Sequence, residues 1–278
     1  MKMISRRSFL AAAGLSVAAL ALTACGGSSS SVASSVASSA SSETASTSAA
    51  AGELTTVMAG KLTMATNATF PPYEMTTDSG DIEGIDVDTA KAIAEKLGLE
   101  LQIDDMDFDA ALLSVQQGKA DIAMAGITVT DERKAVMAFS DSYATGIQSI
   151  IVPNDSEIAS PDDLAGKTIG TQRGTTGYIY CSDDFGDENV VAYDDGLTAV
   201  QALNNGQVDA VVIDNAPAQE FVAANPGLKV LDTSYAEEDY AIGMAKGSAL
   251  EDAVNKALEE LKADGTLQAI VDKYINAN

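Results

Sequence analysis

Apolar and polar residues alternate along this chain with two distinct periods, one typical of helices and one typical of strands. Apolar residues recur three or four positions apart from Ala90 to Leu97, and Gly98 follows them. This spacing puts the apolar side chains on one face of a helix, and a glycine directly after such a run is a common helix end. The pattern therefore predicts a helix over residues 88–97.

The same reasoning predicts short strands and helices in alternation along the rest of the chain. Short apolar runs between turn-forming residues predict strands at 61–65, 99–103, 121–125, 167–171, 189–193, 209–214 and 228–231, and a short extended segment at 84–87. Helical spacing predicts further helices at 108–117, from 175 onward, at 196–204, at 216–224 and over most of 249–274. Strands that alternate with helices indicate an α/β fold.

Two stretches of the sequence repeat one local pattern. In SVQQGKADIAMA (114–125) and in ALNNGQVDAVVI (202–213), an expected helix end is followed by glycine, two further residues, aspartate and an apolar run. Gly118 in the first stretch matches Gly206 in the second. Because the pattern occurs once in each series of elements, we expect two similar α/β lobes.

The chain is expected to cross between these lobes twice. The segment YAIGMAKG (240–247) has the pattern of a strand that returns to the first lobe, and the helical tail would follow it there. The two crossings would lie near 143–150 and near 233–241, and two crossings form a hinge that can close on a ligand. This interpretation assigns 53–146 together with 241–278 to lobe 1, and 147–240 to lobe 2.

The first residues of the chain have the composition of an export signal. Lys2, Arg6 and Arg7 precede an apolar stretch that runs from Phe9 to Leu22. This stretch is shorter than the roughly 20 apolar residues that a membrane-spanning helix needs. The segment around the two arginines also resembles a twin-arginine export motif, which leaves the export route open.

The four residues LTAC (22–25) resemble the lipobox of bacterial lipoproteins. The resemblance implies cleavage before Cys25 and acylation of its thiol; an ordinary signal peptide with an incidental cysteine is the alternative. Residues 26–52 are nearly all Ser, Ala, Gly and Thr, so they cannot bury enough apolar surface to fold. We therefore expect a lipoprotein signal peptide over 1–24, and an acylated cysteine with a flexible tether over 25–52.

The net charge of the chain limits the kinds of molecule that it can be expected to bind. The whole chain has 16 basic and 41 acidic residues, a formal net charge of −25. Loss of residues 1–24 would remove three basic residues and no acidic one, which leaves 13 against 41 and a charge of −28. Because phosphate binding needs clustered Lys and Arg, nucleic acid is not expected as a partner.

The chemistry available to the chain is limited by the absence of histidine. This excludes Ser-His-Asp and Cys-His nucleophile systems and histidine-based zinc sites. If Cys25 carries lipid, Cys181 is single, and we expect it to be a small residue inside a helix. No cofactor, metal or catalytic residue is predicted.

Arg133 lies in an unusual place for a cation. In AGITVTDERKAV (125–136), Thr130 and the two acids after it form a strong helix start, and Arg133 follows directly. The first turn of a helix carries partial positive charge, so an arginine there is unfavourable with respect to the helix dipole. A surface ion pair with the neighbouring acids or an anionic ligand would account for it.

Seven motifs, in order, resemble the family 3 solute-binding proteins of bacterial ABC transporters, which bind polar amino acids. They are ATNATFPPYE, GIDVDTAKAIAEKLG, MDFDAAL, GKADIAMAGITVTDERKAVMAFSDSY, GKTIGTQRGTTG, VDAVVIDNAPA and LKADGTLQAIVDKY, spread over about 58–276. The resemblance implies a two-lobed periplasmic-binding-protein-like fold of type II, with a two-strand hinge and the ligand in the cleft between the lobes. It further implies an amino acid as ligand, a membrane permease as partner, an extracytoplasmic location and a monomer.

The resemblance also implies how the ligand's carboxylate is held. Arg133 would grip the α-carboxylate through its planar guanidinium. Gly126 and Thr128 would assist from the same lobe. Thr175 and Thr176, at the start of a helix in the second lobe, would add N–H donors to the same carboxylate.

The α-ammonium group is expected to meet Asp214. This residue ends the apolar run AVVID, and a carboxylate at that end of a strand faces the crevice in such sheets. The family residue at this position takes the ammonium group. Capping of the next helix is the alternative interpretation.

Four further positions are expected to select the ligand's side chain. Phe70 and Phe108 match aromatic positions that enclose it, although either could be a core residue. Asn67 stands where binders of basic amino acids often have aspartate, and Gln172 occupies a position that varies with specificity. Two amides and two phenyl rings suggest a polar ligand of medium size with an uncharged side chain.

Two other functions share the scaffold. Some relatives are dehydratases of prephenate or arogenate, and Asp214 or Glu74 could supply an acid or base. An intact amino-acid clamp argues against prephenate, which lacks the amine. A ligand-sensing module of a membrane receptor is the third possibility. No transmembrane or signalling segment follows the last motif, and this argues against a receptor module.

Two further residues, Glu74 and Tyr143, could contribute to ligand binding near the rim of the cleft.

Overall fold

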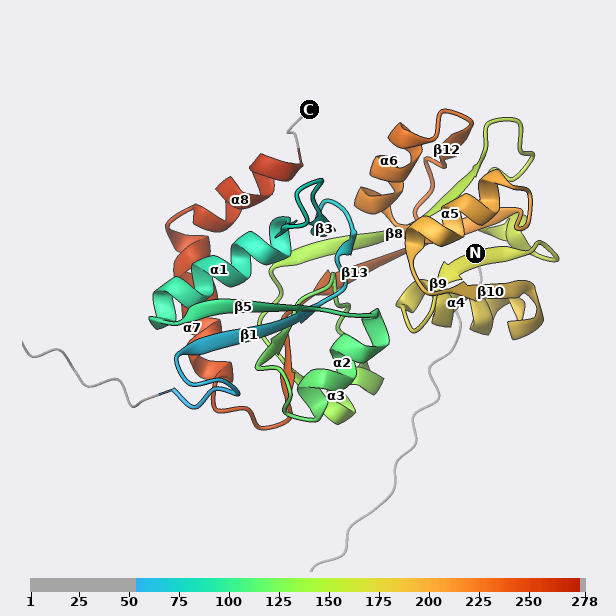
Figure 1. Ribbon diagram of the computed structural model, residues 1–278. Coiled ribbons are helices and arrows are strands. Elements are labelled where there is room, and N and C mark those ends of the chain that lie inside the picture. Colours follow the sequence, from blue (N-terminus) through green and yellow to red (C-terminus); the bar gives the residue numbers. More distant parts are fainter. Residues whose placement is uncertain (1–53, 276–278) are drawn as a thin grey trace, which may run out of the picture. The chain divides into compact units, whose positions relative to one another are not determined.

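The computed structural model describes residues 54–275 of the chain (Figure 1). The expected signal peptide, Cys25 and the expected tether lie outside the described residues, so the predictions for them stay predictions. Within 54–275, no helix combines the length and the apolar character needed to cross a membrane.

The first lobe is built on a five-stranded sheet with the order β5-β1-β6-β14-β7. Its strands are β1 (Lys61–Thr66), β5 (Glu100–Asp105), β6 (Ile122–Ala123), β7 (Met137–Phe139) and β14 (Gly243–Ala245). Strand β1 is parallel to β5 and β6, whereas β14 is antiparallel to β6 and β7.

Helices and a small second sheet complete this lobe. Helix α1 (Ile85–Leu97) contacts β1 and β5, and it also contacts the C-terminal helices α7 (Glu251–Ala263) and α8 (Thr266–Tyr274). Helix α2 (Phe108–Gln116) contacts β1, β6 and β14, and the short α3 (Asp131–Val136) leads into β7. The small sheet joins β2 (Thr69–Phe70), β3 (Glu74–Thr76) and β4 (Ile82–Glu83).

The second lobe is built on a sheet with the order β10-β9-β11-β8-β12, with β13 also paired to β8. Its strands are β8 (Ala144–Pro153), β9 (Ile169–Gln172), β10 (Val190–Tyr193), β11 (Ala210–Asp214), β12 (Leu228–Val230) and β13 (Ala236–Tyr240). Its α-helices are α4 (Thr176–Phe185), α5 (Gly196–Asn204) and α6 (Asn215–Ala224), with one-turn 3-10 helices at Pro161–Leu164 and Asp187–Asn189.

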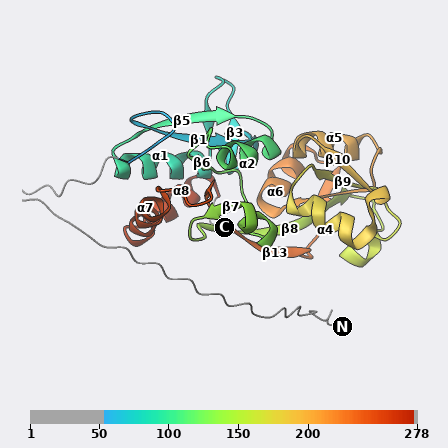
Figure 2. The same cartoon turned by 90° about the horizontal axis from the view of Figure 1, so that it is seen from below.

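Strands β8 and β13 run side by side where the chain passes between the two lobes (Figures 1 and 2). They pair antiparallel from Ala144 opposite Tyr240 to Gln148 opposite Ala236. After β13 the chain enters β14, which lies between β6 and β7 in the first sheet. These strands lie where the sequence predicts the two crossings, and the two-lobed α/β prediction is confirmed.

The prediction of an extended segment over 84–87 is wrong, because helix α1 already begins at Ile85. Gly84 precedes it with a φ of 139°, and an added Cβ at Gly84 would collide with the backbone carbonyl of Tyr73. The N–H of Ile85 donates to Pro72 O at 3.1 Å, so the loop before β3 satisfies the start of the helix. The small sheet was not predicted, because strands of two or three residues are too short to show a period.

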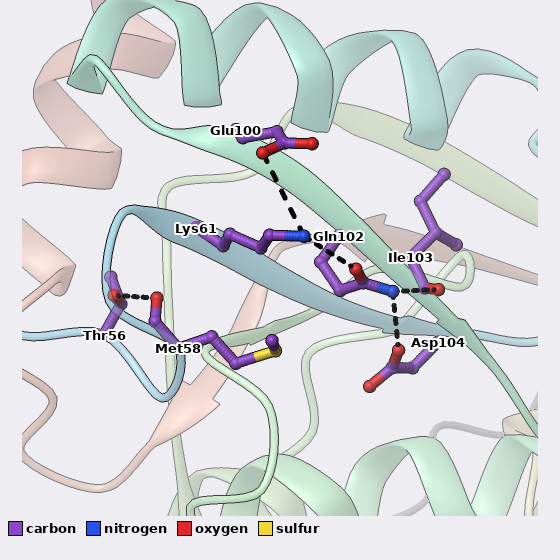
Figure 3. Close-up of polar contacts among 7 residues, drawn as sticks. All are labelled: Thr56, Met58, Lys61, Glu100, Gln102, Ile103 and Asp104. Atoms are coloured by element: carbon purple, nitrogen blue, oxygen red, sulfur yellow. Dashed lines mark hydrogen bonds and ion pairs between the residues drawn. The ribbon is translucent and has the colours of Figure 1, made fainter.

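The outer edge of the first sheet is held mainly by its backbone pairing. Figure 3 shows Lys61 of β1 with its Nζ 4.0 Å from Glu100 Oε2 and 3.3 Å from Gln102 Oε1, both on β5. Exposed ion pairs of this kind contribute at most about 1 kcal/mol. The register is therefore set by the parallel hydrogen bonds and by the fully buried Leu62 and Met64 on β1.

Cys181 lies in α4, fully buried in the core of the second lobe. Burial raises the pKa of its thiol to about 12, which keeps the thiol protonated and unreactive at neutral pH.

Candidate functional site

One cavity between the two lobes is lined by all ten residues that the sequence singles out as ligand contacts. They are Asn67, Phe70, Phe108, Gly126, Thr128, Arg133, Gln172, Thr175, Thr176 and Asp214. The remaining lining residues are Glu74, Ala125, Gln148, Val212 and Ile213. Among the described residues, no cluster of three or more Cys, Asp or Glu side chains is arranged to hold a metal ion.

Arg133 is a buried cation held by carbonyl groups. Its side chain is positioned by α3, whose first turn is capped by Thr130: the Arg133 N–H donates to Thr130 Oγ1 at 3.2 Å. Nη1 donates to Thr128 O at 2.7 Å, and Nη2 donates to Gly174 O, in the other lobe, at 3.1 Å. The guanidinium lies over the ring of Phe108, 5.4 Å from its centroid.

No acidic side chain within residues 54–275 forms an ion pair with Arg133, so the surface-pair interpretation does not describe this residue. Burial lowers the pKa of Arg133, and the negative charge of Glu238 is the largest effect that opposes this. A guanidinium carries five N–H donors, of which these two contacts use two. Arg133 therefore retains donor capacity in the cavity.

Two of the three threonine hydroxyls at the site are bound by one carboxylate. Thr128 Oγ1 donates to Glu238 Oε2 at 3.0 Å, and Thr176 Oγ1 donates to the same oxygen at 2.9 Å. Gln148 Nε2 is its third donor, at 2.9 Å. Glu238, on the connecting strand β13, thus touches residues of both lobes at once.

The second lobe presents the start of helix α4 to the cavity. Thr175 is its N-cap: its Oγ1 accepts from Tyr178 N at 3.3 Å and donates to Gln172 O at 2.8 Å. Thr176, the first helical residue, is buried. The N–H groups of a first helical turn have no partner within the helix, which makes this end suited to an anion.

Asp214 ends β11 and is 8% exposed. Its Oδ2 accepts from Gln148 Nε2 at 2.9 Å, and its Oδ1 accepts from the hydroxyl of Tyr240. Its side chain makes no capping hydrogen bond to α6, so the capping interpretation of Asp214 does not hold. Burial raises the pKa of this carboxyl to about 7.

Two amides meet across the cleft. Gln172 Nε2 donates to Asn67 Oδ1 at 2.8 Å, and Asn67 Nδ2 donates to Met106 O at 3.1 Å. The space left open among the lining side chains is about 20 Å³, the size of a water site or two. An amino acid needs these side chains to move apart.

Glu74 lies inside the cavity rather than near its rim, which corrects the expectation from sequence. It is fully buried, and its carboxyl oxygens accept no hydrogen bond from an N–H or hydroxyl group of the described residues; its polar partner is another acid, Asp86. Burial and then the neighbouring Asp86 raise the pKa of Glu74 well above its ordinary value. Tyr143 does not line the cavity; its hydroxyl donates to Asp86 Oδ2 at 2.8 Å.

Three polar residues in or directly beside the site were not singled out from sequence. Asp86 is fully buried in the first turn of α1, where an acid ordinarily indicates only a favourable helix dipole contact. Its Oδ2 also accepts from the Gly126 N–H at 3.0 Å. Glu238 stands in the acidic run AEED, which is typical of an exposed surface, and Gln148 stands in an apolar run. Nothing local distinguishes these positions.

Known proteins with similar sequences and structures are binding proteins for amino acids. The L-cystine-binding protein TcyJ of Escherichia coli K12 is 32% identical over 223 residues, which cover 79% of this chain and 84% of that one. The arginine-binding extracellular protein ArtP of Bacillus subtilis 168 is 34% identical over 224 residues, 77% and 86% of the two chains. The crystal structure of the arginine-, lysine-, histidine-binding protein ArtJ of Geobacillus stearothermophilus superposes with a TM-score of 0.75 at 35% identity, covering 78% of this chain and 96% of that one.

The family match extends over residues 62–277, which includes all three sheets apart from Lys61, the connecting strands and every residue of the cavity described above. The chain belongs to the bacterial extracellular solute-binding proteins, family 3.

Proposed function

We propose that this protein is the extracytoplasmic substrate-binding component of an ABC importer, and that it binds a polar amino acid by its α-carboxylate and α-amino groups. One observation carries the proposal: Arg133 from the first lobe and Asp214 from the second line the same buried cavity. The relatives that bind L-cystine or arginine by name support an amino acid as the ligand.

The carboxylate end would lie between Arg133 and the start of α4. Arg133 offers the N–H donors that its two carbonyl contacts leave free, and a planar guanidinium can bind both carboxylate oxygens at once. The first N–H groups of α4, beside Thr175 and Thr176, would contribute from the other lobe. Gly126 and Thr128 would border this part of the site.

The ammonium end would lie at Asp214. This carboxylate is fixed by Gln148 and Tyr240, so it is held in one orientation before the ligand arrives. A buried carboxylate gains a charge-assisted hydrogen bond when it meets an ammonium group. Phe70, Phe108, Asn67 and Gln172 would surround the ligand's side chain.

Ligand entry would require the lobes to separate about the β8–β13 connection. We propose lobe boundaries at 53–146 with 241–278 and at 147–240. The contacts that would break are those of Gln172 with Asn67 and of Arg133 with Gly174. Closure would then bring both halves of the site onto the ligand.

We also propose that the protein is a monomer held at the outer side of the cell membrane by lipid on Cys25, where it meets its permease. The lipobox-like residues before Cys25 and the Ser-rich segment after it support this. Labelling of cells with a palmitate analogue should mark the wild-type protein, and Cys25→Ser should abolish the label. Label that persists in the variant would contradict the anchor.

A thermal-shift screen of the free amino acids tests the proposed function directly. A ligand that binds only the folded state raises the melting temperature, so at least one polar amino acid should stabilise the protein. The same amino acid without its carboxylate, or with its amine acetylated, should lose the effect, because each change removes one charged end. The ligand should be recovered unchanged, since no catalytic role is proposed. A screen without any stabilising amino acid would refute the proposal.

A further inference from the structure

We propose that the side chain of the bound amino acid ends in a cation and that Glu74 is its counter-ion. This inference rests on the proposed function and names the class of amino acid. It replaces the uncharged side chain that the two amides suggest from sequence.

Glu74 is a buried carboxyl whose polar partner in the fold is another acid, Asp86, and not a base. It lies on β3, none of its surface is exposed, and it lines the cavity. Neither oxygen accepts a hydrogen bond from an N–H or hydroxyl group of the described residues, so only a proton shared with Asp86 can satisfy the pair. An unpaired polar group in the interior destabilises the fold. A group from outside that pairs with Glu74 would remove this penalty.

The surroundings of the cavity contain an excess of acid. Glu74, Asp86, Asp214 and Glu238 are all buried, whereas Arg133 is the one buried base among residues 54–275. None of the four acids forms an ion pair with a basic side chain of the described residues. A zwitterion with a neutral side chain adds no net charge to this region. Burial raises the pKa of Glu74, Asp86 and Asp214, so these acids tend to hold protons in the fold. A cationic side chain would take the place of the proton on Glu74.

The two charged ends of the amino acid are assigned to other residues, so Glu74 is available to bind the side chain of the ligand. The carboxylate end is assigned to Arg133 and the α4 start, and the ammonium end to Asp214. Glu74 belongs to the small sheet, where it is the direct cross-strand partner of Phe70. Cations are attracted both to carboxylates and to the faces of aromatic rings, so β2 and β3 together offer a fitting surface.

Asp86 is a less suitable counter-ion, because its Oδ2 already accepts from the Gly126 N–H and from the Tyr143 hydroxyl. It also does not line the cavity. Among the four buried acids, Glu74 is thus the cavity-lining one that receives no N–H or hydroxyl donor on either oxygen.

Titration calorimetry with L-arginine and L-citrulline tests this inference. The two have the same shape, but citrulline has a neutral ureido group in place of the guanidinium. The wild-type protein should bind L-arginine about 100-fold more tightly than L-citrulline, and L-lysine should be preferred over L-glutamine in the same sense.

Glu74→Gln should lower the arginine-to-citrulline preference at least tenfold, chiefly through weaker arginine binding. Glu74→Asp keeps the charge and should retain part of the preference. Glu83→Gln is the matched control, because it makes the same charge change in the same small sheet without lining the cavity; its preference should equal that of the wild type.

The outcomes separate this inference from the proposed function. Equal affinity of the wild-type protein for arginine and citrulline overturns the inference while the amino-acid function stands, and this comparison does not depend on the folding of any variant. An unchanged preference in a folded Glu74→Gln protein also overturns it. Binding of no amino acid at all refutes the proposed function instead.

Discussion

At the scale of single residues, the site depends on buried charges that the fold holds in fixed positions. Arg133 is kept in place by two carbonyl oxygens, one from each lobe. Asp214 is kept in place by an amide and a hydroxyl. Because neither group is paired with an opposite charge of the described residues, each can recognise one end of a zwitterion.

Arg133→Lys should lose most of the ligand affinity although it keeps the charge. An ammonium group cannot reproduce the two parallel hydrogen bonds of a guanidinium. Arg133→Ala should cost on the order of 2–5 kcal/mol of binding free energy, measured by calorimetry. Arg173→Lys is the control, since Arg173 is exposed and pairs with Asp194 at 3.6 Å outside the cavity. If the ligand affinity of Arg133→Lys lies within twofold of the wild-type affinity, Arg133 does not bind the ligand's carboxylate.

Ligand affinity should fall as the pH is lowered through the pKa of Asp214, which burial raises to about 7. The ammonium group needs the ionised carboxylate, so below this pH the affinity should drop by up to about tenfold per pH unit. Affinities measured between pH 8 and pH 5 check this. In Asp214→Asn the affinity should be low and this part of the pH dependence should vanish. An affinity for the wild-type protein that stays constant over the range would count against the assignment.

Residues inside contiguous motifs could be predicted, whereas residues that act from behind the site could not. Arg133 and Asp214 stand at recognisable helix and strand ends. Glu238 reaches the site only because β13 pairs with β8 and brings it against Thr128 and Thr176. Such a position depends on contacts between residues far apart in the chain, which no local period reveals.

At the scale of elements, the turn before α4 lies close against α2 of the other lobe. Gly174 has a φ of 75°, and an added Cβ there would collide with the side chain of Asp109. The same glycine accepts the hydrogen bond from Arg133 Nη2. A larger residue at this point would therefore oppose the close approach of the lobes.

Gly174→Ala should weaken ligand binding by hindering closure. Gly166→Ala is a matched control: Gly166 has a similar φ of 74°, but an added Cβ there meets nothing within 4 Å. Both variants bear backbone strain of about 1 kcal/mol, and only the first has the collision. Calorimetry, together with the ligand-induced change in radius of gyration, measures the difference. The second substitution Asp109→Ala should restore part of the binding, and equal behaviour of the two glycine variants would refute the closure argument.

Elements with a clear period were predicted well: α5 and β11 match the prediction to within one residue, whereas α1 begins three residues earlier than predicted. The residue pattern predicted β8 and β13 only as crossings, whereas the resemblance to the family implied that two strands form the hinge. Strand β13 carries three acids in five residues, AEEDY, so its composition is unlike that of a strand. Pairing with β8 overrides this local preference.

At the scale of the whole molecule, an acidic chain encloses several acids in its interior. The formal net charge is −25, and Glu74, Asp86 and Asp214 are buried near the cavity. Burial raises the pKa of Asp86 to about 6 and that of Asp214 to about 7. The ligand-free fold therefore holds protons that the unfolded chain releases.

The ligand-free protein should be more stable at mildly acidic pH than at neutral pH. Between the ordinary carboxyl pKa of 3.8 and the raised values of about 6 and about 7, the folded state binds more protons than the unfolded state. The free energy of unfolding then falls as the pH rises through this window. Melting temperatures from pH 5 to pH 8 check the sign, and Asp214→Asn should flatten the slope. A melting temperature that rises toward pH 8 would contradict it.

One oxygen of Glu238 accepts hydrogen bonds from Thr128, Thr176 and Gln148, which line the cavity, so the connecting strand β13 is bonded to residues that would surround the ligand. Each threonine hydroxyl has one hydrogen to donate, and that hydrogen is already committed to β13. A ligand that accepts a hydrogen bond from either threonine hydroxyl would break the bond between that hydroxyl and Glu238 on β13, the strand about which the lobes would turn. Ligand binding and hinge movement would therefore depend on the same hydrogen bonds, and no further residues are needed to couple the two.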